Sequence, residues 1–141
     1  MSKDYVIAVD PGVGYFAEAR FAAERLISVN LVRGKACHVP HCVFALVMEK
    51  PQVYASGRAR KSDIVDLAIA AGRIAQALGA DMEVWYTPAQ WKGQIKKGPH
   101  HARIRSRLDE KELALLAGLP QKELVHILDA VGLGLFHLGR I

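Results

Sequence analysis

Three carboxylates lie within or at the ends of apolar segments, where an ionised side chain is costly. Asp10 and Glu49 each close an apolar run, and Asp129 lies inside one near the C-terminus. A buried carboxylate is unfavourable unless it is paired or binds a metal ion. The formal net charge is +5, which favours a polyanionic partner. Together these features indicate a metal site that acts on phosphate groups.

A histidine joins this set of acids. His126 precedes Asp129 by three residues, so a helix places both side chains on one face. Oxygen ligands favour Mg²⁺ or Mn²⁺ over zinc, and the imidazole favours Mn²⁺. Two ions about 4 Å apart would activate a water and stabilise a leaving 3′ oxygen, and the central Asp10 would bridge them. The catalytic and metal-binding residues that we expect are Asp10, Glu49, His126 and Asp129.

Each of these residues also has a structural interpretation. Asp10 precedes Pro-Gly and suits a turn, whereas Glu49 has Lys50 and Arg58 nearby in the sequence as possible partners. His126 suits a hydrogen-bonded core histidine. The occurrence of all three acids on apolar segments favours the metal site over these separate explanations.

Basic residues are concentrated in two segments without acids, residues 50–61 and 92–107. Such segments are either solvated loops or contacts for phosphate groups. The residues that we expect to bind the phosphate groups of a polyanion are Arg58, Arg60, Lys61, Lys92, Lys96, Lys97, Arg103, Arg105 and Arg107.

A cluster of zinc-type ligands occurs at Cys37, His38, His41 and Cys42. Structural zinc sites usually take their ligands from separate chain segments, because a six-residue loop rarely arranges four ligands tetrahedrally. We therefore predict a short connection with reduced thiols, and the sequence leaves open whether these residues bind anything.

The elements that must position the acids follow from hydrophobic periodicity and turn residues. Predicted strands cover residues 5–10, 15–21, 25–33, 43–49 and 82–86. Predicted helices run from the N-cap Ser62 to Leu78, from Pro88 for a short distance, and over 109–117 and 121–138, with a chain break at Gly98-Pro99. This order predicts an α/β fold with a mixed five-stranded sheet flanked by helices: the first three strands suit an antiparallel meander, and the strand–helix–strand unit suits a parallel pair. If strand 4 lies beside strand 1 and parallel to it, Glu49 reaches the same edge of the sheet as Asp10.

Two of these elements carry more specific expectations. In strand 25–33, the side chains of Ile27, Val29 and Leu31 form an apolar stripe with a period of two. The Ala-rich apolar face of helix 63–78 is predicted to pack on the sheet, with a dimer contact as the alternative.

The length of 141 residues and a hydrophobic content of 51% suit one domain, residues 1–141, with a substantial core. No apolar stretch is long enough to span a bilayer, and no signal peptide is recognisable. We therefore expect no membrane partner and a cytoplasmic location.

The sequence resembles the RuvC-type Holliday junction resolvases of the RNase H-like nuclease superfamily. The resemblance rests on Ile7-Ala8-Val9-Asp10-Pro11-Gly12 with a following hairpin, on Glu49 at the end of strand 4, and on His126-Ile127-Leu128-Asp129-Ala130. The short segment 34–42 leaves no room for the helix usual there, which is similar to compact phage or organellar versions.

The resemblance implies a homodimer that uses Mg²⁺ or Mn²⁺, two ions per site, to cut two opposed strands of a four-way DNA junction. It implies that Asp10, Glu49 and Asp129 are the family's acids and that His126 takes its remaining position. It implies that Tyr54 stacks on bases at the crossover and that one of the lysines 92, 96 and 97 is catalytic or binds phosphate. A branch-migration partner stays unknown.

Three alternatives remain open. One is a broader nuclease for branched DNA or RNA–DNA hybrids, and another is a non-catalytic DNA-binding member of the superfamily. The third is a sugar-kinase or actin-like ATPase, since residues 10–14 resemble a phosphate loop, but the chain lacks the second domain and the later Gly-rich loop of that fold.

Overall fold

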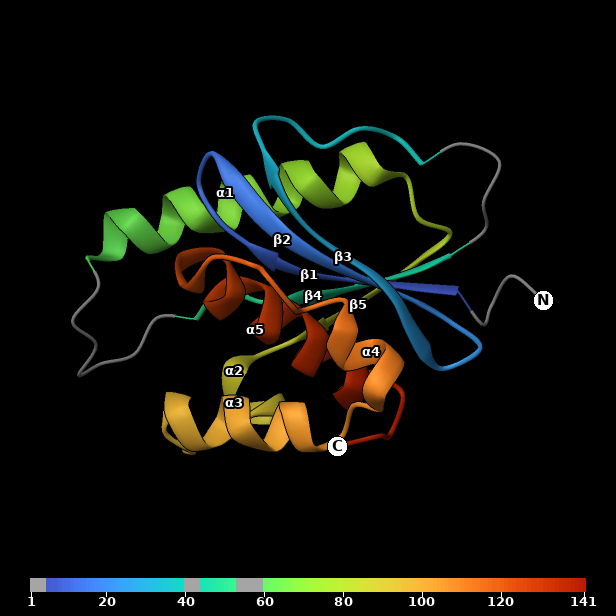
Figure 1. The fold of residues 1–141 in the computed structure, drawn as a ribbon. Coiled ribbons are helices and arrows are strands. Elements are labelled where there is room, and N and C mark those ends of the chain that lie inside the picture. The colour runs from blue at the N-terminus through green and yellow to red at the C-terminus, as the bar shows by residue number, and fades with distance from the viewer. Residues whose placement is uncertain (1–4, 40–43, 53–59) are drawn as a thin grey trace.

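The computed structural model describes residues 5–39, 44–52 and 60–141 (Figure 1). The strands are β1 (Tyr5–Pro11), β2 (Tyr15–Ala22), β3 (Arg25–Arg33), β4 (Ala45–Glu49) and β5 (Met82–Tyr86). The helices are α1 (Lys61–Leu78), α2 (Pro88–Trp91), α3 (Lys97–Ser106), α4 (Glu110–Ala114) and α5 (Gln121–His137). Every predicted strand and helix is therefore present in the structure. One further helix, α3, lies where a chain break was predicted.

The sheet has the strand order β3-β2-β1-β4-β5. Strands β1, β2 and β3 form an antiparallel meander, whereas β4 is parallel to β1 and β5 is parallel to β4. The mixed sheet, the antiparallel meander and the parallel pair of β4 and β5 are therefore as predicted, and the condition that strand 4 lies beside strand 1 and parallel to it is met. The two parallel strands β1 and β4 lie at the centre, where both faces of the sheet are covered.

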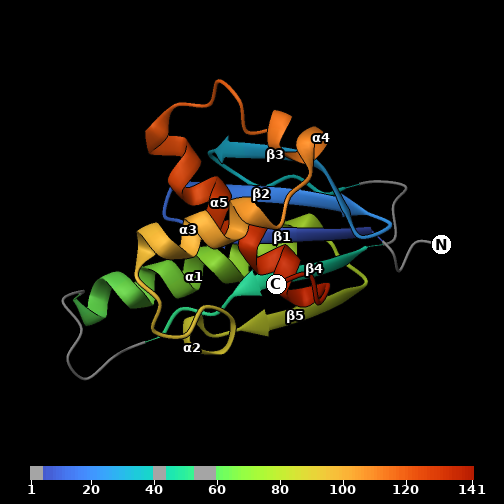
Figure 2. The same cartoon turned by 60° about the horizontal axis from the view of Figure 1, so that its bottom comes forward.

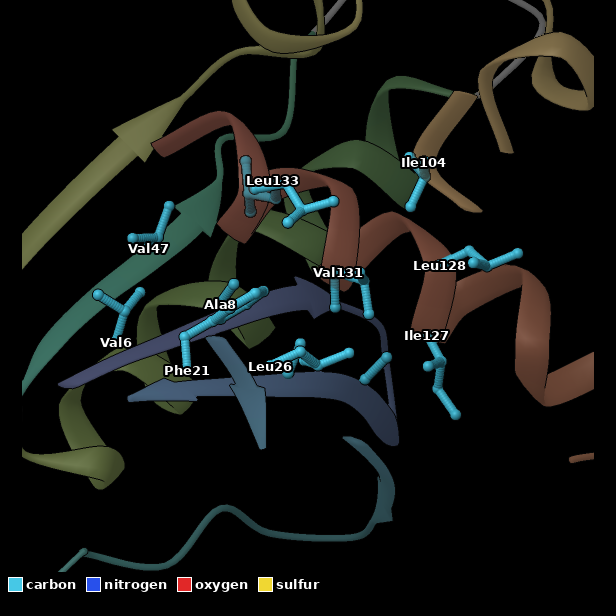
Figure 3. Packing of buried hydrophobic residues seen from close by; sticks show 14 of the residues in the cluster. Val6, Ala8, Phe21, Leu26, Val47, Ile104, Ile127, Leu128, Val131 and Leu133 are labelled. Atoms are coloured by element: carbon cyan, nitrogen blue, oxygen red, sulfur yellow. The ribbon is translucent and has the colours of Figure 1, made fainter. Parts of the chain in front are cut away.

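Alternation along the strands divides the core into two layers. Val6 and Ala8 of β1 point to the face covered by α5, and Ile7 and Val9 point to the face covered by α1 (Figures 1 and 2). Figure 3 shows the first layer, in which Val131 and its neighbours on α5 pack against β1, β2 and β4. Successive residues of a strand point to opposite faces, so the position of an acid along β1 or β4 decides whether it faces α5 or α1.

Helix α5 lies very close to the sheet because it carries glycine at two contact points. A Cβ on Gly134 would lie 2.2 Å from the ring of Phe21, and one on Gly132 would lie 2.5 Å from Ile104 and 2.9 Å from Trp91. Side chains at these positions would push the helix away from the sheet and from α3. The glycines therefore fix the depth at which α5 presents His126 and Asp129.

The predicted apolar stripe on strand 25–33 is wrong at Ile27. The register slips between Arg20 and Phe21, so that Phe21 pairs with Leu26 and Ile27 has no partner. This β-bulge turns Leu26 into the α5 layer beside Val29, while Ile27 is 46% exposed.

Helix α3 occupies the segment in which Gly98-Pro99 was predicted to break the chain. Lys96 is its N-cap, so Pro99 falls in the first turn. The amide groups of the first turn have no intrahelical acceptor, and a proline there loses no hydrogen bond. In this sequence Gly98-Pro99 marks the first turn of a helix and not a break in the chain.

Helix α1 differs from expectation only at its first turn. The N-cap is Arg60 rather than Ser62, and Gly79 ends the helix in the left-handed conformation at φ 70° as predicted. Ala71, Ile74, Ala75 and Leu78 pack on the sheet. The apolar face of α1 is therefore a core face, which was the favoured expectation.

The predicted helix at 109–117 is shorter in the structure, and it ends at Ala114. Asp109 and Glu112 form a capping box at its start, each side chain accepting from the other's backbone amide. The last helix ends at His137, one residue before the predicted end. None of the helices that the structure describes has the length and apolar character needed to cross a membrane.

Candidate active site

Two of the three acids lie side by side at one edge of the sheet. Val9 of β1 pairs with Met48 of β4 in a parallel register, so the next residues along each strand are Asp10 and Glu49. Asp10 shares the alternation of Val6 and Ala8, and Glu49 shares that of Ala45 and Val47, all of which face α5. The sheet alone therefore directs both carboxylates to the α5 side.

Helix α5 brings the remaining two predicted residues to this edge. His126 Nδ1 lies 3.5 Å from Asp10 Oδ2. On its other side, His126 Nε2 lies 3.4 Å from the Tyr15 hydroxyl, and the two rings meet edge to face with centroids 5.1 Å apart. These contacts place the His126 turn of α5 against the end of β1.

Glu49 is held by two residues at the end of α2. The indole Nε1 of Trp91 donates a hydrogen bond of 2.8 Å to Glu49 Oε2, and Lys92 Nζ lies 3.5 Å from the same oxygen. The Lys92 ammonium also lies 5.1 Å from the centre of the Trp91 ring. Of the two alternative partners, Arg58 lies outside the described residues, and Lys92 rather than Lys50 is the lysine seen beside Glu49.

Asp129 contacts a residue that the sequence did not single out. His101 Nε2 of α3 lies 2.9 Å from Asp129 Oδ1. The neighbouring His100 is buried against Trp91, with ring centroids 5.0 Å apart in an edge-to-face arrangement. The end of α2 therefore supplies two contacts to Glu49, and α3 supplies one to Asp129.

The carboxylates influence one another electrostatically. Burial raises the pKa of Asp10, and the negative charge of Asp129 raises it further, while the contact with His126 opposes both. Burial also raises the pKa of Glu49, with Lys92 opposing and Asp10 and Asp129 adding to the shift. The interaction with Asp10 raises the pKa of His126. Like charges held this close favour a bound cation.

A divalent ion would have to draw these ligands closer together. Within the described ranges 5–39, 44–52 and 60–141, no three His, Cys, Asp or Glu side chains form a ready cluster around one point. The donor set nevertheless suits a hard cation, because it consists of carboxylates on adjacent backbone positions that repel one another. The chemistry of the residues fits Mg²⁺ or Mn²⁺, with side-chain rotation required.

The basic residues predicted to bind DNA fall into three groups. Arg60 and Lys61 lie at the start of α1, and Lys92 contacts Glu49. The remaining described members lie on or next to α3 and are exposed, namely Lys96, Lys97, Arg103, Arg105 and Arg107. Tyr54 and Arg58 lie outside the described residues, as do His41 and Cys42 of the cysteine–histidine segment.

Three contacting residues were missed from the sequence: Tyr15, Trp91 and His101. The sequence does contain a signal for His101. If a helix starts at Lys97, residue 101 lies one turn later on the same face as this predicted phosphate-binding lysine. No sequence signal marks Trp91 or Tyr15, whose roles depend on how α2 and β2 lie against Glu49 and His126.

Comparison with known proteins gives a likeness in structure only. No family model matches the sequence, and no curated protein does so either. The structure of Thermus thermophilus RuvC matches with a TM-score of 0.59 and 19% identity, over 95% of this chain and 93% of that chain. The chain has the fold of a RuvC-type resolvase.

A second solved structure extends this comparison. Thermus thermophilus RuvC in complex with a Holliday junction substrate matches with a TM-score of 0.54 and 15% identity, over 95% of this chain and 92% of that chain. The RuvC-type fold thus spans nearly the whole chain, as the sequence resemblance predicted. At these identities the likeness concerns the fold, and the chemistry must be argued from the residues themselves.

Proposed function

We propose that this protein is a metal-dependent endonuclease that resolves four-way DNA junctions by paired phosphodiester hydrolysis. The observation that carries the proposal is that Asp10 and Glu49 end adjacent parallel strands at one edge of a RuvC-type sheet, where His126 of α5, one turn before Asp129, lies 3.5 Å from Asp10. A RuvC of the same fold has been solved with a Holliday junction, which favours a branched substrate here.

Asp10, Glu49, Asp129 and His126 would hold the divalent ions, Mg²⁺ or Mn²⁺. When bound, two such ions supply an activated water and stabilise charge on the leaving oxygen. The protein side chains do the rest: His126 contacts Asp10, and Trp91 and Lys92 orient Glu49. Lys92 also places a positive charge where a scissile phosphate would approach Glu49.

DNA binding is proposed for the exposed basic side chains of α3. Lys97 and Arg105 lie four residues either side of His101, so the three side chains form a row along one face of the helix. His101 contacts Asp129, which places this row beside the acids. A DNA strand that follows α3 would therefore bring a phosphate to the carboxylates, with Lys97 and Arg105 on neighbouring phosphates.

A homodimer is part of the proposal because a four-way junction presents two equivalent strands. Two copies related by a two-fold axis would present two equivalent sites. The outer side of α1 carries two apolar residues one turn apart, Val65 at 55% exposure and Ile69 at 48%. Exposed aliphatic side chains at this spacing favour packing against the same helix of a second copy.

The substrate is tested with a panel of labelled nucleic acids. The wild-type protein is incubated with a four-way junction, a flap, a linear duplex and an RNA–DNA hybrid, each with Mg²⁺, with Mn²⁺ and with chelator. The proposal expects paired cuts in the junction, dependence on the ion, and slower cutting of every other substrate.

The other outcomes separate the alternatives. Faster cutting of the hybrid or the flap would replace junction resolution with a broader nuclease activity. Binding of the junction without cutting in either ion would indicate a non-catalytic DNA-binding protein. Either result would contradict the proposed function.

A further inference from the structure

His101 is the residue of α3 that reaches the proposed metal site. Its Nε2 lies 2.9 Å from Asp129 Oδ1, and both side chains are nearly enclosed, at 12% and 14% exposure. An ionised carboxylate oxygen only accepts hydrogen bonds, so the proton of this contact lies on His101 Nε2. The contact therefore holds one oxygen of Asp129, and no side chain among the described residues bonds to the other, Oδ2, which can face a cation.

The helix that carries His101 is firmly anchored. His100, Ile104 and Leu108 recur every four residues and are buried, so α3 presents one side to the core and His101 lies on its flank. Ile104 packs toward α5 in Figure 3, and Gly132 of α5 admits both Ile104 and Trp91 at close range. These contacts restrict where His101 can lie, which a positioning role requires.

The same arrangement recurs at Glu49. There Trp91 donates from its ring N–H to Oε2, as His101 does to Asp129. His100 packs edge-on against Trp91 and so connects the two donors. Helices α2 and α3 thus form an outer layer in which one ring N–H orients each of two acids, and outer-layer donors of this kind adjust how strongly a carboxylate binds metal.

We propose that His101 is a positioning residue that holds Asp129 Oδ1 through its Nε2–H and so orients the Asp129 carboxylate for metal binding. This inference rests on the proposed metal site. It assigns to α3 a second task beside DNA contact, because the same helix face carries Lys97, His101 and Arg105.

The test compares three variants by Mn²⁺ binding to the DNA-free protein, measured by calorimetry at one fixed pH. His101→Leu keeps the bulk of the side chain and removes the donor, whereas His101→Gln places an amide N–H close to the position of Nε2. His137→Leu is the control, since His137 is a half-buried histidine bonded to the Tyr86 hydroxyl and to no acid within the described ranges.

The inference expects a graded result. His101→Leu should weaken Mn²⁺ binding by about 10- to 100-fold, the range typical of outer-layer residues. His101→Gln should recover most of that loss, and His137→Leu should bind as the wild type does. If His101→Leu fails to fold by circular dichroism, His101→Met, which is flexible and apolar, takes its place.

Two results would overturn the inference while leaving the proposed function standing. One is unchanged Mn²⁺ binding by folded His101→Leu, and the other is an equal loss in His101→Gln, which would show that the imidazole does more than donate to Asp129. A wild-type protein that neither binds Mn²⁺ nor cuts the junction would overturn the proposed function and this inference with it. Junction cutting by the wild type keeps the two failures distinguishable.

Discussion

Glu49 shows how neighbouring side chains determine what a carboxylate can do. Its Oε2 receives a hydrogen bond from Trp91 and lies near the Lys92 ammonium, while burial and the charges of Asp10 and Asp129 raise its pKa. The two donors oppose this rise in the pKa of Glu49. Without them, Glu49 would be a weaker ligand, because a protonated carboxyl binds metal poorly.

The first prediction concerns the indole donor. Trp91→Phe keeps an aromatic ring against His100 and removes the N–H, so junction cleavage at limiting Mg²⁺ should fall by about 10- to 100-fold. Trp85→Phe is the matched control, because Trp85 donates in the same way to Glu83, which lies outside the site. The initial cleavage rates of both variants are measured over a range of Mg²⁺ concentrations. Equal rates for the two variants would remove Trp91 from the site.

Among single residues, the sequence predicted that Asp10 and Glu49 lie at one edge of the sheet, but not which side chains contact them. Asp10 and Glu49 could be found because a strand alternates its side chains and ends at a definite residue. Their partners Trp91 and Lys92 follow β5 and turn back over Glu49, a path that depends on tertiary packing. His101 was missed because its helix was missed.

Helix α3 is the element whose charge distribution the structure explains best. Lys97 and Arg105 share a face with His101 and so lie beside the acids, and the Lys97 charge lowers the pKa of His126 against the effect of Asp10. A pair of cations on this face would repel each other less when a phosphate lies between them.

The second prediction uses the salt dependence of junction binding. Lys97→Ala and Arg105→Ala should each weaken binding and reduce the slope of log affinity against log salt by about 1, because each removes a phosphate contact. Lys111→Ala is the control, since Lys111 is exposed on α4 away from this face. Fluorescence anisotropy in Ca²⁺ measures binding without cleavage. A slope unchanged by Lys97→Ala or Arg105→Ala would place the DNA elsewhere.

Helix α4 has a structural task, which is to fasten the C-terminus to the β2–β3 hairpin. Glu112 is 1% exposed and accepts hydrogen bonds from both terminal nitrogens of Arg140, at 2.7 and 2.8 Å, and from the amide of Leu26. Arg140 also donates to the carbonyl of Glu24 in the hairpin turn. The hydrogen bonds hold the pKa of Glu112 at about 2.

The third prediction is a pH-dependent loss of stability. The folded pKa of Glu112 lies below the ordinary 4.5, so its contribution is complete well above pH 4.5 and is lost as pH falls toward about 2. Glu112→Gln leaves Arg140 partly unpaired and should lower the free energy of unfolding by about 3–5 kcal/mol near neutral pH. Urea unfolding of both proteins at pH 7 and near pH 3 measures the gap, the difference between their free energies of unfolding. This gap should be smaller at pH 3 than at pH 7. A gap independent of pH would contradict this role.

The predicted element boundaries were wrong where a short sequence is compatible with two structures. Gly98-Pro99 indicates either a break or a first turn, and only the packing of His100 and Ile104 against the core selects the helix. The bulge at Ile27 follows from the register between β2 and β3 and leaves no local mark in the sequence. Long segments with clear periodicity, such as α1 and α5, were predicted almost to the residue.

For the whole molecule, the sequence predicted the antiparallel meander and the parallel pair of β4 and β5 but not which strand lies beside β1. Three adjacent strands favour a meander, and a strand–helix–strand unit favours a parallel pair with a right-handed crossover. The position of β4 beside β1 then brings Asp10 next to Glu49. The distances around His126 and Asp129 could not be predicted, since they depend on how closely Gly132 and Gly134 let α5 approach.

The fourth prediction addresses assembly. Val65→Asp combined with Ile69→Lys should convert the proposed dimer to a monomer, because two exposed aliphatic contacts on α1 are replaced by charges. Ile27→Lys is the control, an exposed isoleucine on β3 of similar exposure. Sedimentation velocity over a range of concentrations measures the assembly state. A wild-type monomer, or a double variant that stays dimeric, would contradict the α1 contact.

The central claim is that acids from β1, β4 and α5 act together on divalent ions to cut a branched DNA. The most direct measurement is cleavage of a four-way junction by Asp10→Asn, Glu49→Gln and Asp129→Asn, alongside binding of the same junction in Ca²⁺. Each variant should lose more than about 100-fold in cleavage rate, beyond the range typical of outer-layer residues, and should bind the junction much as the wild type does. Full cleavage by any of the three variants would contradict the account.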